Sequence, residues 1–317
     1  MNIITSINAK GGCGKSTIAM SLAAGLSKLG HTTLLIDMDP QAQVTQWLGL
    51  GDGLSPAGTL VEAMAGEKQL AELVQSTALA NLSFVASAEG LEEVGRQITD
   101  REDYATLFTR LLAPLGERFA FCVIDSPNQI SPVMANAIWP TDLFVVPFES
   151  TKAVRSYANF YQLLLSLRPA EEHRVLHVLS NLTRQPGLRR RVMEVMDAHG
   201  ILRAGSEVRT CGWLAQVDEH GGSIFDWRPH SRGAEDMANL VNEVLVALGR
   251  EPEFPVKEIA PPPVATTEVR PLVPDDEVPA LGTYTLNEGE LIPHPPDGNT
   301  SATERSINSQ RHQSNPT

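Results

Sequence analysis

Cysteine is scarce in this chain: Cys13, Cys122 and Cys211 are the only three among 317 residues, and they form no C-x-x-C pair. An odd number of widely spaced thiols excludes a disulfide framework and argues against a zinc or iron–sulfur site, so we expect reduced cytosolic thiols. Long apolar runs are also missing, since no stretch approaches the roughly 18–20 consecutive apolar residues that a membrane-spanning helix needs. The N-terminus has the pattern of a strand and not of a secretion signal.

A basic charge excess is missing from the chain as a whole, because the formal net charge is −13. The charge is unevenly distributed. Residues 1–150 carry 8 Lys and Arg and 16 Asp and Glu, residues 151–250 carry 13 and 11, and residues 251–317 carry 4 and 11. The segment 151–250 is therefore net positive, and the overall acidity does not exclude a nucleic-acid-binding surface.

The composition changes after residue 250. Twelve of the 22 prolines lie in residues 251–317, and residues 299–317 are almost wholly polar. Such a segment buries too little apolar surface to offset its chain entropy. We therefore expect a folded domain over residues 1–250 and a Pro-rich, acidic, disordered tail over residues 251–317.

Within the first 250 residues, short apolar runs alternate with segments of helical periodicity. This alternation predicts a doubly wound α/β fold with a mostly parallel sheet and helices on both faces. The expected strands are Ile3–Ile7, Thr32–Asp37, Leu82–Ala86, Phe121–Asp125, Leu143–Pro147 and Val175–Asn181. The longer expected helices are Ser16–Leu29, Leu91–Leu112, Val154–Leu167, Leu188–His199 and Ala234–Leu248. Ligands of such folds bind beyond the carboxyl ends of the strands.

Directly after the first strand comes a glycine-rich loop with two lysines. Residues 10–17 read Lys10, Gly11, Gly12, Cys13, Gly14, Lys15, Ser16 and Thr17. Glycines let successive backbone N–H groups point at phosphate oxygens, and the helix N-terminus that follows also favours an anion. Lys15 is expected to reach the terminal phosphates and Ser16 to supply a hydroxyl to Mg²⁺. This pattern predicts a P-loop for ATP that uses residues 11–17. Cys13 lies at a helix N-terminus, which can lower the pKa of a thiol, but we expect a variable loop position and not redox regulation.

The front lysine, Lys10, makes the loop resemble the deviant Walker A loop of the ParA/MinD family of P-loop ATPases. Three later segments resemble further family motifs in the same order, so that the resemblance covers roughly residues 1–249: Leu34–Gln41, Val123–Pro127, and Gly221–Asp226 with Gly233 and Ala234 after it. The resemblance implies an ATP-dependent homodimer in which Lys10 reaches the phosphates of the partner subunit. It also implies ATP and Mg²⁺ as cofactors.

Carboxylates end two of the predicted strands. By the resemblance, Asp39 positions the attacking water, so Lys10, Lys15 and Asp39 are the expected catalytic residues. Asp37 is expected to hold the magnesium water shell or the loop, although both aspartates could instead cap the following helix. Asp125 is expected to orient Mg²⁺ through water, which gives Ser16, Asp37 and Asp125 as the metal-site residues.

Two positions near these motifs are less certain. Asn128 stands where the family usually has a second proline or glycine, which leaves Asp125 in place but changes the switch after it. Asn181 follows a predicted strand at a position that resembles the adenine contact of the family, and a plain strand-ending Asn fits this position nearly as well.

The densest group of basic residues comprises Arg184, Arg189, Arg190, Arg191, Arg203 and Arg209. Such a run is often a solvated helix face. The resemblance to ParA proteins, which bind DNA non-specifically, makes it a candidate DNA surface that needs only phosphate neutralisation. The arginines that the family carries just before Gly221 are poorly matched here, and Arg228 and Arg232 are possible substitutes. The candidate DNA-binding residues are therefore Arg189, Arg190, Arg191, Arg228 and Arg232.

The leading hypothesis is a bacterial, cytoplasmic and nucleoid-associated ParA-type ATPase of the small type, without an N-terminal helix-turn-helix. A ParB-like or other adaptor would stimulate hydrolysis, and the cargo would be a plasmid, a chromosome or a protein assembly such as a carboxysome. A MinD-like membrane ATPase is the first alternative, but residues 299–317 lack the apolar face that it needs, so no membrane partner is expected. A cluster- or metal-carrier ATPase is disfavoured by the cysteine pattern, and a non-hydrolysing scaffold by the complete set of expected catalytic residues.

Overall fold

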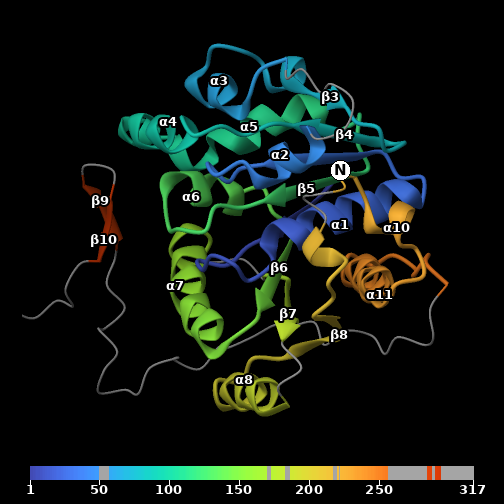
Figure 1. The fold of residues 1–317 in the computed structure, drawn as a ribbon. Helices are drawn as coiled ribbons and strands as arrows, with labels where there is room; N and C mark the ends of the chain where they lie inside the picture. The colour runs from blue at the N-terminus through green and yellow to red at the C-terminus, as the bar shows by residue number, and fades with distance from the viewer. Residues whose placement is uncertain are drawn as a thin grey trace, which may run out of the picture.

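The computed structural model describes residues 1–49, 57–169, 173–182, 186–216, 220, 222–255, 284–287 and 290–293. An eight-stranded sheet lies at the centre, with the strand order β3-β4-β2-β5-β1-β6-β7-β8 (Figure 1). All neighbouring strands are parallel except β3, which pairs antiparallel with β4. The strands are β1 (Asn2–Ser6), β2 (Thr33–Asp37), β3 (Gln75–Ser76), β4 (Leu82–Val85), β5 (Phe121–Asp125), β6 (Leu143–Phe148), β7 (Val175–Leu182) and β8 (Arg203–Arg209).

Helices cover both faces of this sheet, so the predicted doubly wound α/β fold is confirmed. Figure 1 shows α1, α10 and α11 on one side of the strands and α6 and α7 on the other. The α-helices are α1 (Lys15–Lys28), α2 (Gln43–Gly49), α3 (Leu60–Ala65), α4 (Leu91–Gln97), α5 (Leu107–Leu112), α6 (Pro132–Ile138), α7 (Thr151–Leu167), α8 (Pro186–Ala198), α10 (Ile224–Trp227) and α11 (Arg232–Ala247). Short 3-10 turns at Leu70–Leu73, Ile98–Asp100, Tyr104–Thr106, Ala113–Leu115 and Leu214–Gln216 complete the connections.

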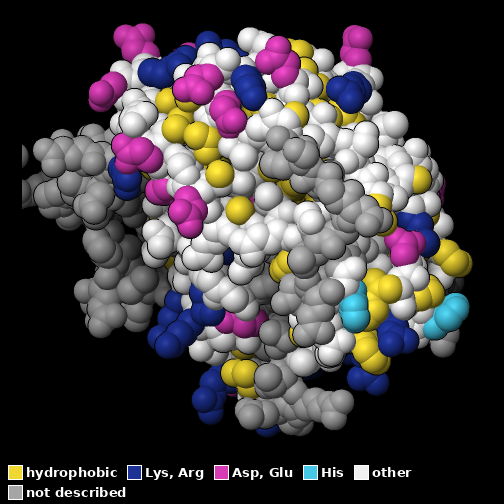
Figure 2. Space-filling model, turned by 45° about the horizontal axis from the view of Figure 1, so that its top comes forward, with side chains coloured by type: hydrophobic (Ala, Val, Ile, Leu, Met, Phe, Trp, Pro, Cys, Tyr) yellow, Lys and Arg dark blue, Asp and Glu magenta, His cyan; other side chains and the backbone are white. Residues whose placement is uncertain are grey.

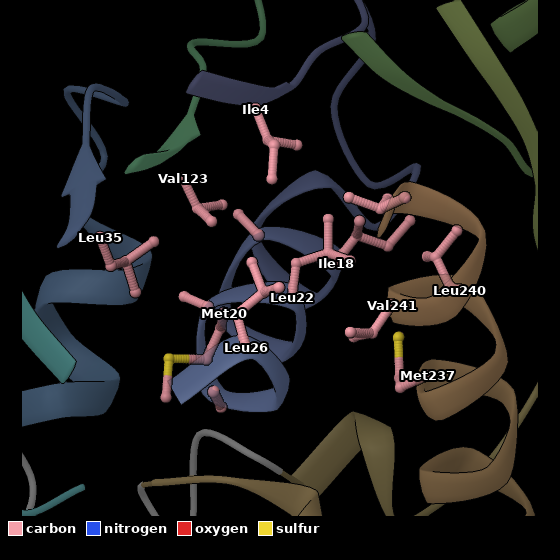
Figure 3. Close-up of a cluster of buried hydrophobic side chains, with 14 of the residues drawn as sticks. Ile4, Ile18, Met20, Leu22, Leu26, Leu35, Val123, Met237, Leu240 and Val241 are labelled. Carbon is pink, nitrogen blue, oxygen red and sulfur yellow. The ribbon is translucent and has the colours of Figure 1, made fainter. Parts of the chain in front are cut away.

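The central strands are buried on both faces because their apolar side chains alternate between two clusters. On β2, Leu35 packs into the cluster under α1 and α11, whereas Leu34 and Ile36 pack against α3–α6. Figure 3 shows the first cluster, in which Leu35, Val123 and Ile4 of the sheet face α1, and α11 closes the cluster from the side. The helix that follows the phosphate loop is therefore held between the sheet and α11.

One predicted helix, Leu91–Leu112, is wrong as a single element. The chain forms α4, two 3-10 turns and α5 over this range. The charged residues at positions 100–103 interrupt the apolar periodicity, and Thr99 and Asp100 are weak helix formers. The sequence pattern also missed α6 and the edge strand β8, whose Ala, Gly and Ser residues give no strand signal.

The folded domain continues past the predicted boundary at residue 250. The Asn242 side chain of α11 accepts hydrogen bonds from the backbone N–H groups of Glu253 and Phe254, both at 2.9 Å, and donates to the Phe254 carbonyl at 2.9 Å. The Phe254 ring stacks on Phe225, with the ring centroids 5.2 Å apart. The chain is thus part of the core as far as Phe254.

Within the predicted tail, β9 (Tyr284–Asn287) and β10 (Glu290–Pro293) pair with each other as an antiparallel hairpin. This short pairing differs from the expectation of a tail without structure, and Tyr284, Thr285 and Ile292 are residue types that favour strands. Apart from these strands and residues 251–255, the predicted tail lies outside the described part of the chain. Among the described helices, none has the length and apolarity to cross a membrane.

Candidate nucleotide-binding site

The glycine-rich loop forms a tight turn between β1 and α1. Gly12 and Gly14 adopt φ angles of 77° and 96°, in the left-handed region that a side chain disfavours. Gly14 is also the N-cap of α1, so the helix begins at Lys15 and its free N–H groups face the loop. The local sequence thus requires glycine at these two positions, and the turn presents backbone donors to an anion.

Two serine hydroxyls, one from β1 and one from β7, fix the loop. The Ser6 Oγ at the end of β1 donates to the Lys15 carbonyl at 3.0 Å, and the Ser180 Oγ of β7 donates to the Cys13 carbonyl at 2.8 Å. The Cys13 thiol is fully buried and donates to the Lys10 carbonyl at 3.2 Å. Burial raises the pKa of this thiol despite the nearby Lys15 charge, so Cys13 belongs to the wall that supports the loop.

Both lysines of the loop are turned onto the loop itself. The Lys15 Nζ donates to the Lys10 carbonyl at 3.0 Å, and the Lys10 Nζ donates to the Gly11 carbonyl at 3.0 Å. The Lys10 ammonium also forms an ion pair with Glu149 at 2.5 Å. Glu149 immediately follows β6 and was not singled out from the sequence, because a single acidic residue at a strand end has no distinctive pattern.

Asp37 and Asp125 end adjacent strands and face each other in register. Asp37 is fully hydrogen-bonded: its Oδ1 accepts from the Asp39 N–H at 3.0 Å, and its Oδ2 accepts from the backbone N–H and hydroxyl of Thr45, both at 2.9 Å. Burial is the main cause that raises the pKa of Asp37 to about 7. Asp37 therefore holds the loop that leads into α2.

Asp125 differs from Asp37 although it is equally buried. Neither of its carboxylate oxygens has a hydrogen-bond partner of standard geometry among the described residues, but the Ser16 hydroxyl lies close enough to lower its pKa. Burial raises its pKa well above the ordinary value, and the neighbouring Asp37 adds to the rise. A buried carboxylate with free oxygens is expected to bind a cation, directly or through water. The donor set around Ser16 and Asp125 therefore fits Mg²⁺, which prefers oxygen ligands.

Asp39 lies in the pocket above the loop. Its Oδ1 accepts from the Gln41 N–H at 2.9 Å, and its side chain is largely buried. Burial raises its pKa, whereas the Gln41 N–H and the Lys15 charge oppose the rise. The second oxygen has no hydrogen bond with a described residue, so Asp39 is placed to accept a proton or a hydrogen bond from a small molecule in the pocket.

The pocket itself joins these elements into one cavity that runs from the phosphate loop to α11. The sequence-predicted residues on its walls are Gly11, Gly12, Gly14, Lys15, Ser16, Thr17 and Asp39. The remaining walls were not predicted, and they include Gln41, Gln43, Trp47, Asn128, Ser180, Val208, Arg209, Cys211, Leu214, Ala215 and Met237. The apolar part of this second group gives the pocket a surface that suits a flat, uncharged base.

Some predicted residues lie outside the cavity walls. Lys10, Cys13, Asp37 and Asp125 support the loop or the strand ends instead of lining the pocket. The backbone of Asn181 belongs to β7, but its side chain is outside the described residues, as are Arg184 and Gly221. Asn128 lines the pocket, and its Nδ2 would lie 3.7 Å from a Cβ added to Gly11.

The candidate DNA-binding arginines do not form one cluster. Arg189 pairs with Glu207 and Arg190 with Glu194, at 3.7 Å for the latter, whereas Arg191 is exposed. These three lie on α8, whereas Arg228 directly follows α10 and Arg232 is the first residue of α11. Figure 1 shows α8 apart from α10 and α11.

Arg228 stacks its guanidinium on the Trp213 ring, with 4.1 Å between the guanidinium carbon and the ring centroid. Arg232 is exposed at the first position of α11. Among the five candidates, Arg191, Arg228 and Arg232 thus have no ion pair with a described residue.

Comparison with known proteins shows the family of the chain. A model of an AAA domain family matches residues 1–174, which is more than half of the chain. The cell division protein PomZ of Myxococcus xanthus is 26% identical over 76% of this chain and 77% of its own length. The chromosome partitioning protein ParA of the same organism is 31% identical over 46% of this chain and 52% of its own length. The structure of apo McdA from Cyanothece superposes with a TM-score of 0.67 at 25% identity, covering 78% of this chain and all of that one.

The chain therefore belongs to this AAA domain family and is an ATPase of the ParA/MinD superfamily, with ATP and Mg²⁺ as its cofactors.

Proposed function

We propose that the chain is a ParA-type positioning ATPase, which forms a dimer around ATP, binds DNA non-specifically and moves a cargo through partner-stimulated hydrolysis. The observation that carries the proposal is the second lysine, Lys10, in front of a complete phosphate loop. By the resemblance to ParA/MinD ATPases, a second lysine at this position delivers its charge to the phosphates across a dimer interface, where it stabilises charge that develops during hydrolysis. The names of the relatives, which include chromosome partitioning and cell division proteins, support a positioning role.

In this proposal each residue of the site has its own role in binding or hydrolysis. The backbone N–H groups of residues 11–17 and the Lys15 ammonium bind the phosphates, and Ser16 with Asp125 holds Mg²⁺, which neutralises phosphate charge when bound. Asp39 accepts a hydrogen bond from the attacking water and orients it. Asp37 keeps the Asp39 loop in place through its bonds to Thr45 and the Asp39 N–H.

DNA binding in this proposal depends on exposed basic side chains of the second half of the chain. Figure 2 shows acidic side chains concentrated in the upper half of the molecule and mainly basic ones in the lower half. Arg191, Arg228 and Arg232 are the best candidates, because their charges are not neutralised by a described acidic partner. Contacts of this kind neutralise phosphates without reading sequence.

Dimerisation is tested by light scattering of purified protein with and without ATP and Mg²⁺. We expect Asp39→Ala to bind ATP and remain dimeric, because it loses water positioning but keeps the phosphate loop. We expect Lys10→Ala to bind ATP and remain monomeric. A monomeric Asp39→Ala together with a dimeric Lys10→Ala contradicts the assignment of both residues.

DNA binding is tested by fluorescence anisotropy with two duplexes of unrelated sequence over a range of salt. We expect binding that requires ATP, ignores sequence and weakens with salt by about 0.9 log units per log unit for each phosphate contacted. The triple replacement of Arg191, Arg228 and Arg232 by Ala should reduce both affinity and salt slope. The matched control replaces Arg96, Arg101 and Arg110, which lie on or next to α4 and α5, and should bind as the wild type does. Equal losses in both variants contradict the location.

A further inference from the structure

The proposed role of Lys10 requires its side chain to reach into the partner subunit. In the structure, contacts within its own subunit hold this side chain. Its Nζ lies 2.5 Å from the Glu149 Oε1 and donates to the Gly11 carbonyl at 3.0 Å. The contact is partly shielded from solvent, since the side chain of Lys10 is 26% exposed and that of Glu149 is 15% exposed. An ion pair in this setting is stronger than one on the open surface.

Glu149 is itself held in a fixed position. It follows directly after β6, and its Oε1 also accepts a hydrogen bond from the Ser150 hydroxyl at 2.9 Å. Ser150 is the N-cap of α7 and accepts from the Ala153 N–H at 3.3 Å. The other carboxylate oxygen, Oε2, is buried without a partner among the described residues. Lys10 is therefore the only cation that the described structure pairs with this carboxylate.

A second contact links this ion pair to the phosphate site. The Lys15 ammonium, which is expected to bind the terminal phosphates, instead donates to the backbone carbonyl of Lys10 at 3.0 Å. A bound phosphate competes with that carbonyl for Lys15, because a charge-assisted bond to phosphate is stronger than one to a neutral carbonyl. Phosphate binding thus removes one of the contacts that fix the backbone at residue 10.

We propose that Glu149 is a latch that holds Lys10 on its own subunit until ATP withdraws Lys15 from the Lys10 carbonyl, so that the latch opposes dimerisation of the nucleotide-free protein. This inference rests on the proposed function, because it gives Lys10 a role in the partner subunit. Glu149 acts through Lys10 and is a positioning residue. With the latch, dimer assembly depends on nucleotide in two ways: the nucleotide occupies the phosphate loop, and its binding frees Lys10.

The latch is tested first without nucleotide. Lysine acetylation by acetic anhydride, followed residue by residue with mass spectrometry, measures how accessible each ammonium is. We expect Lys10 to react several-fold faster in Glu149→Gln than in the wild type, while the exposed Lys152 reacts equally in both. Equal Lys10 rates in the two proteins overturn the latch, and this result does not depend on ATP or on dimerisation.

The second test measures the apparent dimer dissociation constant by analytical ultracentrifugation at sub-saturating ATP, where part of the wild type still has the latch closed. We expect Glu149→Gln to dimerise about fivefold more tightly or better, the change that the loss of one partly buried ion pair supplies. Glu102→Gln removes an exposed charge and serves as the control with no effect. In the Lys10→Ala background, Glu149→Gln should have no effect, because the latch acts only through Lys10.

The outcomes separate the latch from the proposed function. A wild type that stays monomeric at all ATP concentrations contradicts the proposed function. The acetylation result then still shows whether Glu149 holds Lys10. A wild type that dimerises while Glu149→Gln dimerises equally or more weakly overturns the latch alone. An equal effect of Glu149→Gln with and without Lys10 assigns Glu149 a structural role and also overturns the latch.

Discussion

Two lysines and three aspartates around the phosphate loop have different environments although they lie close together in the fold. Lys15 is almost fully buried and bonded to a backbone carbonyl, whereas Lys10 is paired with Glu149. Asp37 has its oxygens occupied, and Asp125 has none occupied by a described partner. These differences decide which side chains are available to a ligand. The partners of Lys15 and Asp37 are close in the sequence, whereas Glu149 is far from Lys10 in the sequence.

Removal of the Lys15 ammonium should abolish most nucleotide binding. Lys15→Ala strips one buried positive charge from the phosphate site, where charge interactions are strong because water is largely excluded. We expect ATP affinity or turnover to fall by about a hundredfold or more. Fluorescence titration with a labelled ATP analogue measures the loss, with Lys152→Ala as a control of equal charge change. Magnesium-dependent hydrolysis at the wild-type rate in Lys15→Ala contradicts the site.

At the scale of single elements, the edge strand β8 depends on α11. Glu243 is fully buried, and its two oxygens accept from the backbone N–H groups of Gly205 and Ser206, both at 2.7 Å. Seven residues earlier on the same helix face, Asp236 accepts from the Arg209 N–H at 2.9 Å. A strand with little apolar side chain of its own is thus attached to the sheet by carboxylates of the helix that packs on it.

Glu243→Ala should destabilise the fold strongly, because it leaves two buried N–H groups of β8 without acceptors. We expect the free energy of unfolding to fall by about 2–4 kcal/mol, measured by urea denaturation. Glu235→Ala on the exposed side of the same helix should change it by less than about 0.5 kcal/mol. Similar losses in both variants would mean that the carboxylate bonds to β8 do not carry this stability.

A second element-scale feature is the buried imidazole of His177 on β7. Its Nδ1 bonds to the Leu202 carbonyl at 2.9 Å, and its ring packs against Phe148 and Tyr157. Burial lowers the pKa of His177 from 6.5 to about 4. The unfolded chain therefore binds this proton at a higher pH than the folded chain does.

Acid should destabilise the protein through this histidine. Between pH 6.5 and 4 the unfolded state binds more protons at this site, so stability falls as the pH falls, by about 3 kcal/mol at pH 4. His177→Gln should remove this part of the pH dependence, whereas exposed His230→Gln should leave it unchanged. Urea denaturation at several pH values from 7 to 4 measures the slopes, and parallel slopes for wild type and His177→Gln contradict the prediction.

At the scale of the whole molecule, the described contacts of the folded domain extend past the composition change. Asn242 and Phe225 bind the chain at Glu253 and Phe254, which lie beyond the composition change at residue 250. The composition change and the contacts of the core do not end at the same residue, because a few residues with a single aromatic anchor can pack on the core without altering the average composition.

Two truncations separate these boundaries. A chain that ends at Pro255 should fold, hydrolyse ATP and bind DNA at least as tightly as the full chain, because it loses an acidic segment. A chain that ends at Arg250 also loses the Phe254 ring and three hydrogen bonds, and its free energy of unfolding should fall by about 2–4 kcal/mol. Thermal and urea unfolding measure the stability of both truncated chains. Equal stability of the two truncations contradicts the role of the Asn242 contacts.

The sequence by itself determined the fold class, the phosphate loop and the carboxylates at the strand ends. These are local properties: apolar runs that alternate with helical periodicity, glycines that a left-handed turn requires, and polar residues that directly follow a buried strand. The structure agrees with the sequence at β1, β2 and β5 to within one residue at either end.

Only the tertiary structure decided which side chains meet. The pocket wall of Val208, Leu214 and Met237 comes from residues about 190 positions or more after the phosphate loop, and Glu149 reaches Lys10 from the end of another strand. The break in the predicted helix Leu91–Leu112 and the attachment of β8 also depend on packing. A sequence pattern records the preference of each segment, whereas burial and charge pairing depend on neighbours that the chain brings together only when it folds.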